Sequence, residues 1–140
     1  MNTLLYEDIS VGSKYSFSVE IEAYMLDMFK KISGDVNPLH CEEDYAKAKN
    51  YKGRVVYGML TATFYSTLAG VYIPGKNCLL HSVDTKFVKP VYIGDKLLVE
   101  GTVTEKNDTF KQITIKAVIK NQNDEKVSRA VIKAGVQDDE

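Results

Sequence analysis

The first half of the chain shows two different spacings of hydrophobic residues. Apolar and polar side chains alternate over residues 15–21, and this period of two is typical of a β-strand with one buried face. Over residues 22–33 the apolar side chains recur at the spacing of a helix, which predicts a helix that ends at Gly34. Residues 42–49 predict a second helix that is short and mostly polar.

Residues 58–71 form the most informative predicted helix, because they contain no charged side chain. A helix that is apolar on nearly all sides is expected to be buried on most of its faces. Pro74 and Gly75 follow this segment and indicate where it ends. Since one small sheet would not cover so apolar a helix, its composition favours a second subunit, and we expect a homodimer.

The second half of the chain contains only strand-like runs separated by turn-forming residues such as Pro90 and Gly94. Consecutive strands joined by short turns pair antiparallel, and one face of the resulting sheet must be covered by another element. The apolar helix is the only predicted element long enough to do so. We therefore predict a single α+β domain over residues 1–140, in which a curved antiparallel sheet wraps around one central helix. The predicted strands of this half cover residues 79–88, 96–103, 110–119 and 126–136.

The composition narrows the class of protein further. With 44% hydrophobic and 26% charged residues, the chain is too apolar and too evenly charged to be disordered. Its 18 basic and 19 acidic side chains give a net charge of −1, so we expect neither a nucleic acid nor a membrane as a partner. We also expect neither a transmembrane helix nor a signal peptide. Cys41 and Cys78 have no second cysteine nearby, which predicts no metal site and favours the reducing cytoplasm.

The residues with the clearest chemical potential are Asp35 and His40, which flank a turn stiffened by Pro38. A carboxylate and an imidazole at this spacing can hold a water molecule between them, with one group accepting a proton while the other donates one. The same residues also fit an ordinary turn, because Asp, Asn and Pro are common turn formers. Spacing alone therefore leaves an acid/base pair and a simple turn as alternatives.

Residues 34–40, Gly-Asp-Val-Asn-Pro-Leu-His, resemble the hydratase motif of the MaoC-like dehydratase family, which includes the R-specific enoyl-CoA hydratases. Two further segments agree with this resemblance. Residues 58–60, Gly-Met-Leu, are similar to the family's helix start, and residues 87–95 are similar to its Phe-x-x-Pro-Val-x-x-Gly-Asp turn. The resemblance spans nearly the whole chain and implies a hotdog fold, in which an antiparallel sheet wraps a long central helix and two subunits form a dimer.

The resemblance implies an enzyme that reversibly adds water to a trans-2-enoyl-CoA and gives the 3R-hydroxyacyl-CoA. Asp35 and His40 would be its acid/base pair, although the sequence does not decide which of the two is the base. Coenzyme A or phosphopantetheine would enter as part of the acyl thioester substrate, so neither a separate cofactor nor a metal is implied. Three alternatives stay open: a 3-hydroxyacyl-carrier-protein dehydratase, a thioesterase, and a non-catalytic subunit that binds acyl thioesters. The presence of both Asp35 and His40 argues against the last of these.

Gly58 is a third candidate catalytic residue because of its backbone. The first N–H groups of a helix have no partner within the helix, and the helix dipole adds positive potential there. A thioester carbonyl placed against the N–H of Gly58 would have its developing enolate oxygen stabilised, and glycine lets the carbonyl approach without a side chain in the way. The alternative is a tight helix start with no such role.

Two polar residues are candidates for substrate binding. Asn37 lies between the acid/base pair, and it either orients His40 or the water, or only shapes the turn. Ser66 lies about two helical turns beyond Gly58, on roughly the same side of the helix. The family resemblance implies that this serine lies beside the catalytic water. Without the resemblance, the simpler interpretation is a small buried serine that bonds to its own helix.

Met59 and Tyr57 are the other candidates for substrate binding. Met59 either lines the acyl tunnel or belongs to the core. Tyr57 departs from the family pattern, because members usually carry His immediately before Gly-Met-Leu. The change leaves Asp35 and His40 in place, but we expect it to alter the hydrogen bonding around the helix start and the acyl-chain preference.

Overall fold

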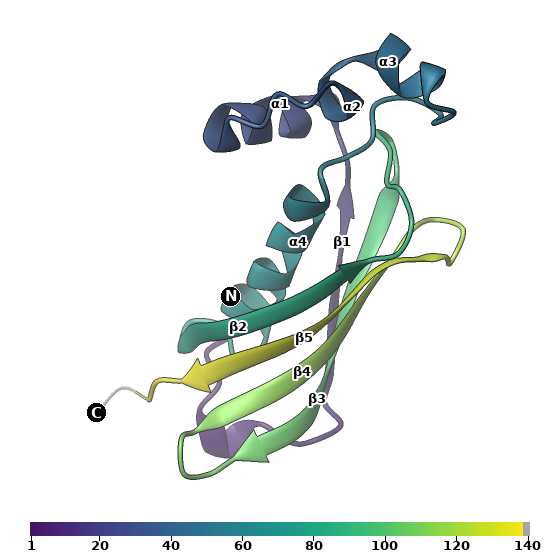
Figure 1. Cartoon of the computed structure of the whole chain (residues 1–140). Helices are drawn as coiled ribbons and strands as arrows, with labels where there is room; N and C mark the ends of the chain where they lie inside the picture. The colour runs from purple at the N-terminus through teal and green to yellow at the C-terminus, as the bar shows by residue number, and fades with distance from the viewer. Residues whose placement is uncertain (139–140) are drawn as a thin grey trace.

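The structure is a computed structural model that describes residues 1–138, and its framework is one antiparallel sheet of five strands (Figure 1). The strands lie in the order β1-β3-β4-β5-β2, and each neighbouring pair runs antiparallel. The predicted α+β class and the four strands predicted in the second half of the chain are confirmed. The 3₁₀ turn η1 (Tyr6–Asp8) comes first, and the strands are β1 (Lys14–Glu20), β2 (Cys78–Phe87), β3 (Lys96–Asn107), β4 (Gln112–Lys120) and β5 (Lys126–Val136).

The position of β2 in the sheet differs from the expectation that consecutive strands pair. β2 pairs with β5 at the edge of the sheet, while β3 lies between β1 and β4. The connection over residues 88–95 is too long for a tight hairpin. It bonds instead to the segment before the helix α4 (Gly58–Thr67), where the N–H of Val56 donates to the carbonyl of Val91 at 2.8 Å. This contact holds the connection beside the start of α4.

The central helix α4 lies across one face of the sheet (Figure 1) and continues into a π-helical turn, η2 (Leu68–Tyr72). Tyr65 and Leu68 on this helical stretch are fully buried. Part of α4 is not covered within one chain, because Met59 is 62% exposed and Ser66 is exposed as well. The sequence predicts that this helix is buried on most of its faces. The helix is more exposed than predicted because the sheet of a single chain covers only one side of it.

Three short helices lie together beyond one end of the sheet (Figure 1). α1 (Ala23–Ser33) ends at Gly34 as predicted, and the backbone of Gly34 is left-handed with φ of 73°. α2 (Pro38–Cys41) is not predicted by the sequence pattern; the side chain of Asn37 caps it, and a proline occupies its first position. α3 (Glu43–Ala48) corresponds to the predicted polar helix. Within residues 1–138, no helix combines the length and the apolar character needed to cross a membrane.

A glycine in β3 lets the sheet approach the central helix closely. A Cβ at Gly101 would lie 2.6 Å from Cδ2 of Leu68 and 2.9 Å from Cγ2 of Ile115. Both of those side chains are fully buried, so neither has free space into which it could move. Gly70, in the same helical turn as Leu68, provides a contrast, because a Cβ there would meet nothing within 4 Å.

We predict opposite effects for alanine at these two glycines. Gly101→Ala overpacks the contact between sheet and helix and should lower the free energy of unfolding by ~1–3 kcal/mol. Gly70→Ala finds free space and restricts the unfolded chain, so it should leave that free energy unchanged or raise it by up to about 1 kcal/mol. Urea denaturation of both variants measures the two effects. Equal stability of Gly101→Ala and wild type would contradict the close approach at this position.

Candidate active site

One cavity of about 460 Å³ collects the three candidate catalytic residues. Asp35 comes from the loop between α1 and α2, His40 from α2, and Gly58 from the first position of α4. The fold therefore brings together groups that three separate elements carry. Two of the candidate substrate-binding residues, Tyr57 and Met59, line the same cavity, as do Phe29, Ser33 and Phe87.

The Asp35 carboxylate is held by short-range hydrogen bonds and keeps one oxygen free. Its Oδ1 accepts a hydrogen bond from the N–H of Asn37 at 3.1 Å, and the N–H of Asp35 donates to Oγ of Ser33 at 3.1 Å. Among residues 1–138, Oδ2 of Asp35 has no hydrogen-bond donor, so it is the oxygen available to a water or a substrate. The side chain of Asn37 accepts from the N–H of Leu39 at 2.9 Å and so shapes the turn, while its role toward the water stays a prediction.

One hydrogen bond determines which nitrogen of His40 is available for proton transfer. Nδ1 of His40 lies 2.7 Å from the carbonyl oxygen of Val55. Because a carbonyl can only accept, Nδ1 carries the proton, and in the neutral ring Nε2 keeps the free lone pair. Arg54 supports the same helix, since its Nε donates to the carbonyl of His40 at 2.7 Å and its Nη2 pairs with Asp27 of α1 at 3.0 Å. His40 is therefore restrained through both its ring and its backbone.

The start of α4 offers an unpartnered backbone donor to the cavity. No side chain caps this helix, and within the described part of the chain no acceptor bonds to the N–H of Gly58. The helix dipole places positive potential at this N–H. The ring of Phe87 lies against Gly58, because a Cβ there would be 3.1 Å from Cδ1 of Phe87. A second hollow of about 310 Å³ also borders His40, Gly58 and Phe87, so two hollows meet at the candidate catalytic residues.

Tyr57 is almost fully buried next to Asp35 and His40, the candidate acid/base pair, with 2% of its surface exposed. Its ring stacks on the imidazole of His40, with the ring centroids 4.2 Å apart. Its hydroxyl donates to the backbone carbonyl of Asp35 at 2.6 Å and lies 3.4 Å from Sγ of Cys41. Burial, the contact with Cys41 and the negative charge of Asp35 raise the pKa of Tyr57 well above its usual range. Tyr57 thus contacts both members of the pair.

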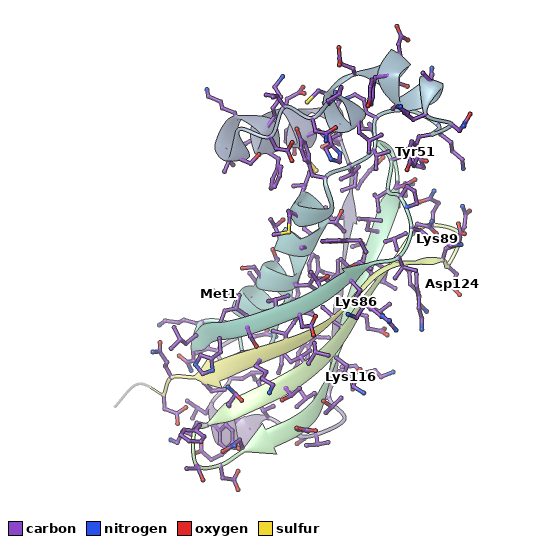
Figure 2. The ribbon with its side chains drawn as sticks, viewed as in Figure 1. Met1, Tyr51, Lys86, Lys89, Lys116 and Asp124 are labelled. Carbon is purple, nitrogen blue, oxygen red and sulfur yellow. The ribbon has the colours of Figure 1, made fainter. Side chains whose placement is uncertain are left out.

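Two polar residues near the site have different surroundings. Ser66 is exposed on α4 and lines neither hollow of a single chain, so its role in substrate binding stays a prediction. Lys89 lines the second hollow, and its ammonium group forms an ion pair with Glu125 that lowers the pKa of that carboxyl. Figure 2 labels Lys89 in the connection after β2 and Asp124 in the turn between β4 and β5, next to Glu125 in the sequence. The charge of Lys89 is therefore already partly balanced by the protein.

Sequence reasoning missed the structural roles of three contributors to this site. Phe87 lines both hollows, and the only sequence signal for it is its place at the start of the 87–95 segment. Val55 acts through its backbone carbonyl, which no sequence pattern can reveal. Arg54 holds α2 through a backbone acceptor and is likewise invisible as a motif.

Comparison with known proteins agrees with the resemblance of the sequence motifs. Residues 8–125 match the MaoC like domain. An (R)-specific enoyl-CoA hydratase of Rhodospirillum rubrum is 37% identical over 99 residues, which are 71% of this chain and 69% of the relative. Another (R)-specific enoyl-CoA hydratase, of Aeromonas caviae, is 33% identical over 98 residues, which are 70% of this chain and 73% of the relative.

Among solved structures, the unliganded R-hydratase PhaJ1 of Pseudomonas aeruginosa is similar to this chain. The TM-score is 0.92 at 27% identity, over 98% of this chain and 88% of that one. The sheet and its central helix therefore have the hotdog arrangement that the sequence resemblance predicts. The chain belongs to the MaoC-like dehydratase family and is a hydro-lyase of the enoyl-CoA hydratase and 3-hydroxyacyl dehydratase kind, which acts on acyl thioesters.

Proposed function

We propose that this chain catalyses the reversible hydration of a trans-2-enoyl-CoA to the (3R)-3-hydroxyacyl-CoA. The observation that carries this proposal is the meeting of three groups of different chemistry at one cavity. The carboxylate of Asp35 and the imidazole of His40 are two proton-transfer groups, and the N–H of Gly58 is a donor for an oxygen that gains charge. Hydration of an enoyl thioester requires both kinds of group.

The polarity of the substrate assigns a role to each group. The thioester carbonyl withdraws electrons from C3, so water attacks C3 and the charge moves to the carbonyl oxygen as an enolate. One member of the Asp35–His40 pair accepts the proton of the attacking water, and the other donates a proton to C2. The N–H of Gly58 stabilises the enolate oxygen, which needs the hydrogen bond more in the transition state than in the ground state. In dehydration the same groups exchange their proton-transfer roles.

Addition to one face of the double bond and the R configuration of the product have separate support. Asp35 and His40 border the same cavity, which favours addition of the hydroxyl and the proton to one face of the double bond. The relatives named (R)-specific enoyl-CoA hydratases support the R configuration at C3.

A hydration assay tests the proposed function directly. Loss of the enoyl absorbance should be followed with enoyl-CoA and enoyl-carrier-protein substrates of several chain lengths, and the product resolved by enantioselective chromatography. We expect turnover of at least one enoyl-CoA to the 3R product. An S product would overturn the stereochemical assignment. Turnover of carrier-bound substrates alone would overturn the coenzyme A assignment. Absence of hydration with every substrate would overturn the proposed function.

We predict that removal of either proton-transfer group abolishes most of the turnover. Asp35→Asn and His40→Ala should each lower kcat by ~10²–10⁴ while the fold stays intact. Because both groups act in one step, the double variant should lose little more than the worse single variant. His81→Ala is the matched control, since the ring of His81 contacts Gln112 and lines neither hollow. Near wild-type hydration by Asp35→Asn would show that the assignment is wrong.

Blocking the backbone donor should impair catalysis more than folding. In Gly58→Ala the new methyl group would enter the space where the carbonyl docks and would lie 3.1 Å from the ring of Phe87, which is half exposed and can yield. Loss of an oxyanion donor typically costs ~10²–10³ in rate, so we expect kcat/KM to fall by that order. Thermal unfolding confirms that the variant folds, and Gly70→Ala on η2 is the control. Wild-type kinetics in a folded Gly58→Ala would place the carbonyl elsewhere.

We further propose that two copies of this chain pair through the free edge of β2. In one chain β2 has a neighbour on one side only. Leu79 and Leu80 on β2 are 47% and 40% exposed, and Phe87 at its end is 52% exposed. An exposed apolar edge strand is a template for pairing with another strand. A second copy would cover this edge and the open part of α4 and would join the two sheets into one.

The assembly can be measured by light scattering at micromolar concentration. We expect twice the mass of one 15.7 kDa chain. Leu80→Lys should shift the protein toward monomer, because a charge on an edge strand opposes pairing. Val11→Lys serves as the control, since Val11 is also exposed but lies in the turn before β1, at the opposite edge of the sheet. A stable wild-type monomer would contradict the pairing.

A further inference from the structure

We infer that Tyr57 is a positioning residue that holds the Asp35 loop and the His40 ring in a fixed arrangement with the N–H of Gly58. The inference rests on the proposed function, because it assigns a role in the same reaction. It extends that function by naming a buried side chain that contacts both proton-transfer residues.

One end of Tyr57 anchors the loop that carries the carboxylate. Residues 34–37 are all exposed, and the hydrogen bonds that hold the Asp35 carboxylate and N–H come from neighbouring residues. The O–H of Tyr57 reaches the loop from the start of α4 and donates to the carbonyl of Asp35 at 2.6 Å. Sγ of Cys41 lies 3.4 Å from the same hydroxyl oxygen, which can accept its S–H. This contact therefore ties an exposed loop to a buried side chain.

The ring of Tyr57 sets the plane of the imidazole. The centroids of the Tyr57 and His40 rings are 4.2 Å apart, and their planes differ by 28°. The hydrogen bond from Nδ1 to the carbonyl of Val55 fixes the imidazole at one atom, and the stacked ring opposes rotation about that bond. Phe29 packs against Tyr57 with a centroid distance of 4.8 Å, which limits movement of the tyrosine itself.

Tyr57 also links these contacts to the third catalytic group. It immediately precedes Gly58 at the start of α4, and its side chain makes no capping bond to the helix. A change at Tyr57 therefore alters how the carboxylate and the imidazole are placed relative to the N–H that receives the carbonyl. Misplacement of a reacting group by ~1 Å can cost on the order of 10²-fold in rate.

The hydroxyl of Tyr57 is not itself a proton donor in the reaction. Its proton is bonded to a backbone carbonyl rather than directed to substrate. Burial raises the pKa of Tyr57 well above its usual range, so the hydroxyl stays neutral at the pH at which histidine titrates. Tyr57 thus acts through Asp35 and His40.

A matched pair of tyrosine variants tests this role. Tyr57→Phe removes the bond to Asp35 and keeps the ring, and we expect kcat to fall about 10-fold while KM stays within about twofold. Tyr65→Phe is the control, because Tyr65 is also buried on α4, its hydroxyl donates to Ser128 at 2.8 Å, and neither of these two residues lines either hollow. An equal effect of the two substitutions on kcat would overturn the inference.

The pH profile and a second substitution separate positioning from proton transfer. Tyr57→Phe should keep the shape of the pH–rate profile of wild type, since only geometry changes. Loss of one limb of that profile would make the hydroxyl a proton-transfer group and would overturn the positioning role. Tyr57→Leu removes the stacked ring as well, and we expect a fall in kcat of about 10²-fold; a loss no greater than that of Tyr57→Phe would overturn the role assigned to the ring.

Two measurements that do not depend on activity separate this inference from the proposed function. Amide hydrogen exchange over residues 34–37 should be faster in Tyr57→Phe than in Tyr65→Phe. The imidazole resonances of His40, assigned with His81→Gln, should shift in Tyr57→Leu. If wild type hydrates no enoyl thioester, the proposed function fails. The exchange rates and the imidazole resonances would still report whether Tyr57 restrains Asp35 and His40. Unchanged exchange and unchanged resonances would overturn the inference whatever the kinetics.

Discussion

The geometry of the site depends on the backbone of residues 55–57, the extended segment that leads into α4. Val55 bonds to α2 through both its N–H and its carbonyl, and the carbonyl accepts from Nδ1 of His40. On the other side, the N–H of Val56 donates to the carbonyl of Val91 in the connection between β2 and β3. The next residues begin α4. Three consecutive residues thereby place the imidazole, the β2–β3 connection and the first N–H of the central helix relative to one another.

His40, the candidate proton-transfer histidine, lies on a helix that would not be stable in isolation. α2 has four residues, far fewer than a helix needs in water without tertiary support. Its stability comes from its surroundings: Asn37 caps its start, Arg54 bonds to the carbonyl of His40, and Val55 holds the ring. The bond from Arg54 is charge-assisted, and the same guanidinium pairs with Asp27, so α1 and α2 are held together. These restraints give a half-buried segment the fixed geometry that the proposed proton transfer requires.

The two candidate proton-transfer residues could be predicted from the sequence because residues 34–40 carry both in one continuous stretch. The strands were predictable for a similar reason, since alternation is a local pattern, and Gly58 could be identified from the general properties of a helix start. The place of β2 in the sheet could not be predicted, because it depends on how residues 88–95 bond to Val56 through the backbone. The partner of His40 could not be predicted either, because every residue has a carbonyl and only the fold selects that of Val55. Contacts made by backbone atoms leave no pattern in the side chains.

The start of α4 shows how the needs of catalysis and of stability differ at one position. Helices commonly begin with Ser, Thr, Asp or Asn, whose side chain bonds to the first N–H groups and adds ~0.5–2 kcal/mol of stability. The N-cap residue of α4 is instead Tyr57, whose hydroxyl bonds to Asp35 and leaves the helix uncapped. A carboxylate at that position would reduce the positive potential at Gly58 and disfavour an approaching thioester oxygen. Under the proposed mechanism, the enolate oxygen accepts from the N–H of Gly58 and meets the uncancelled positive potential of this helix start, which stabilises the transition state more than the ground state.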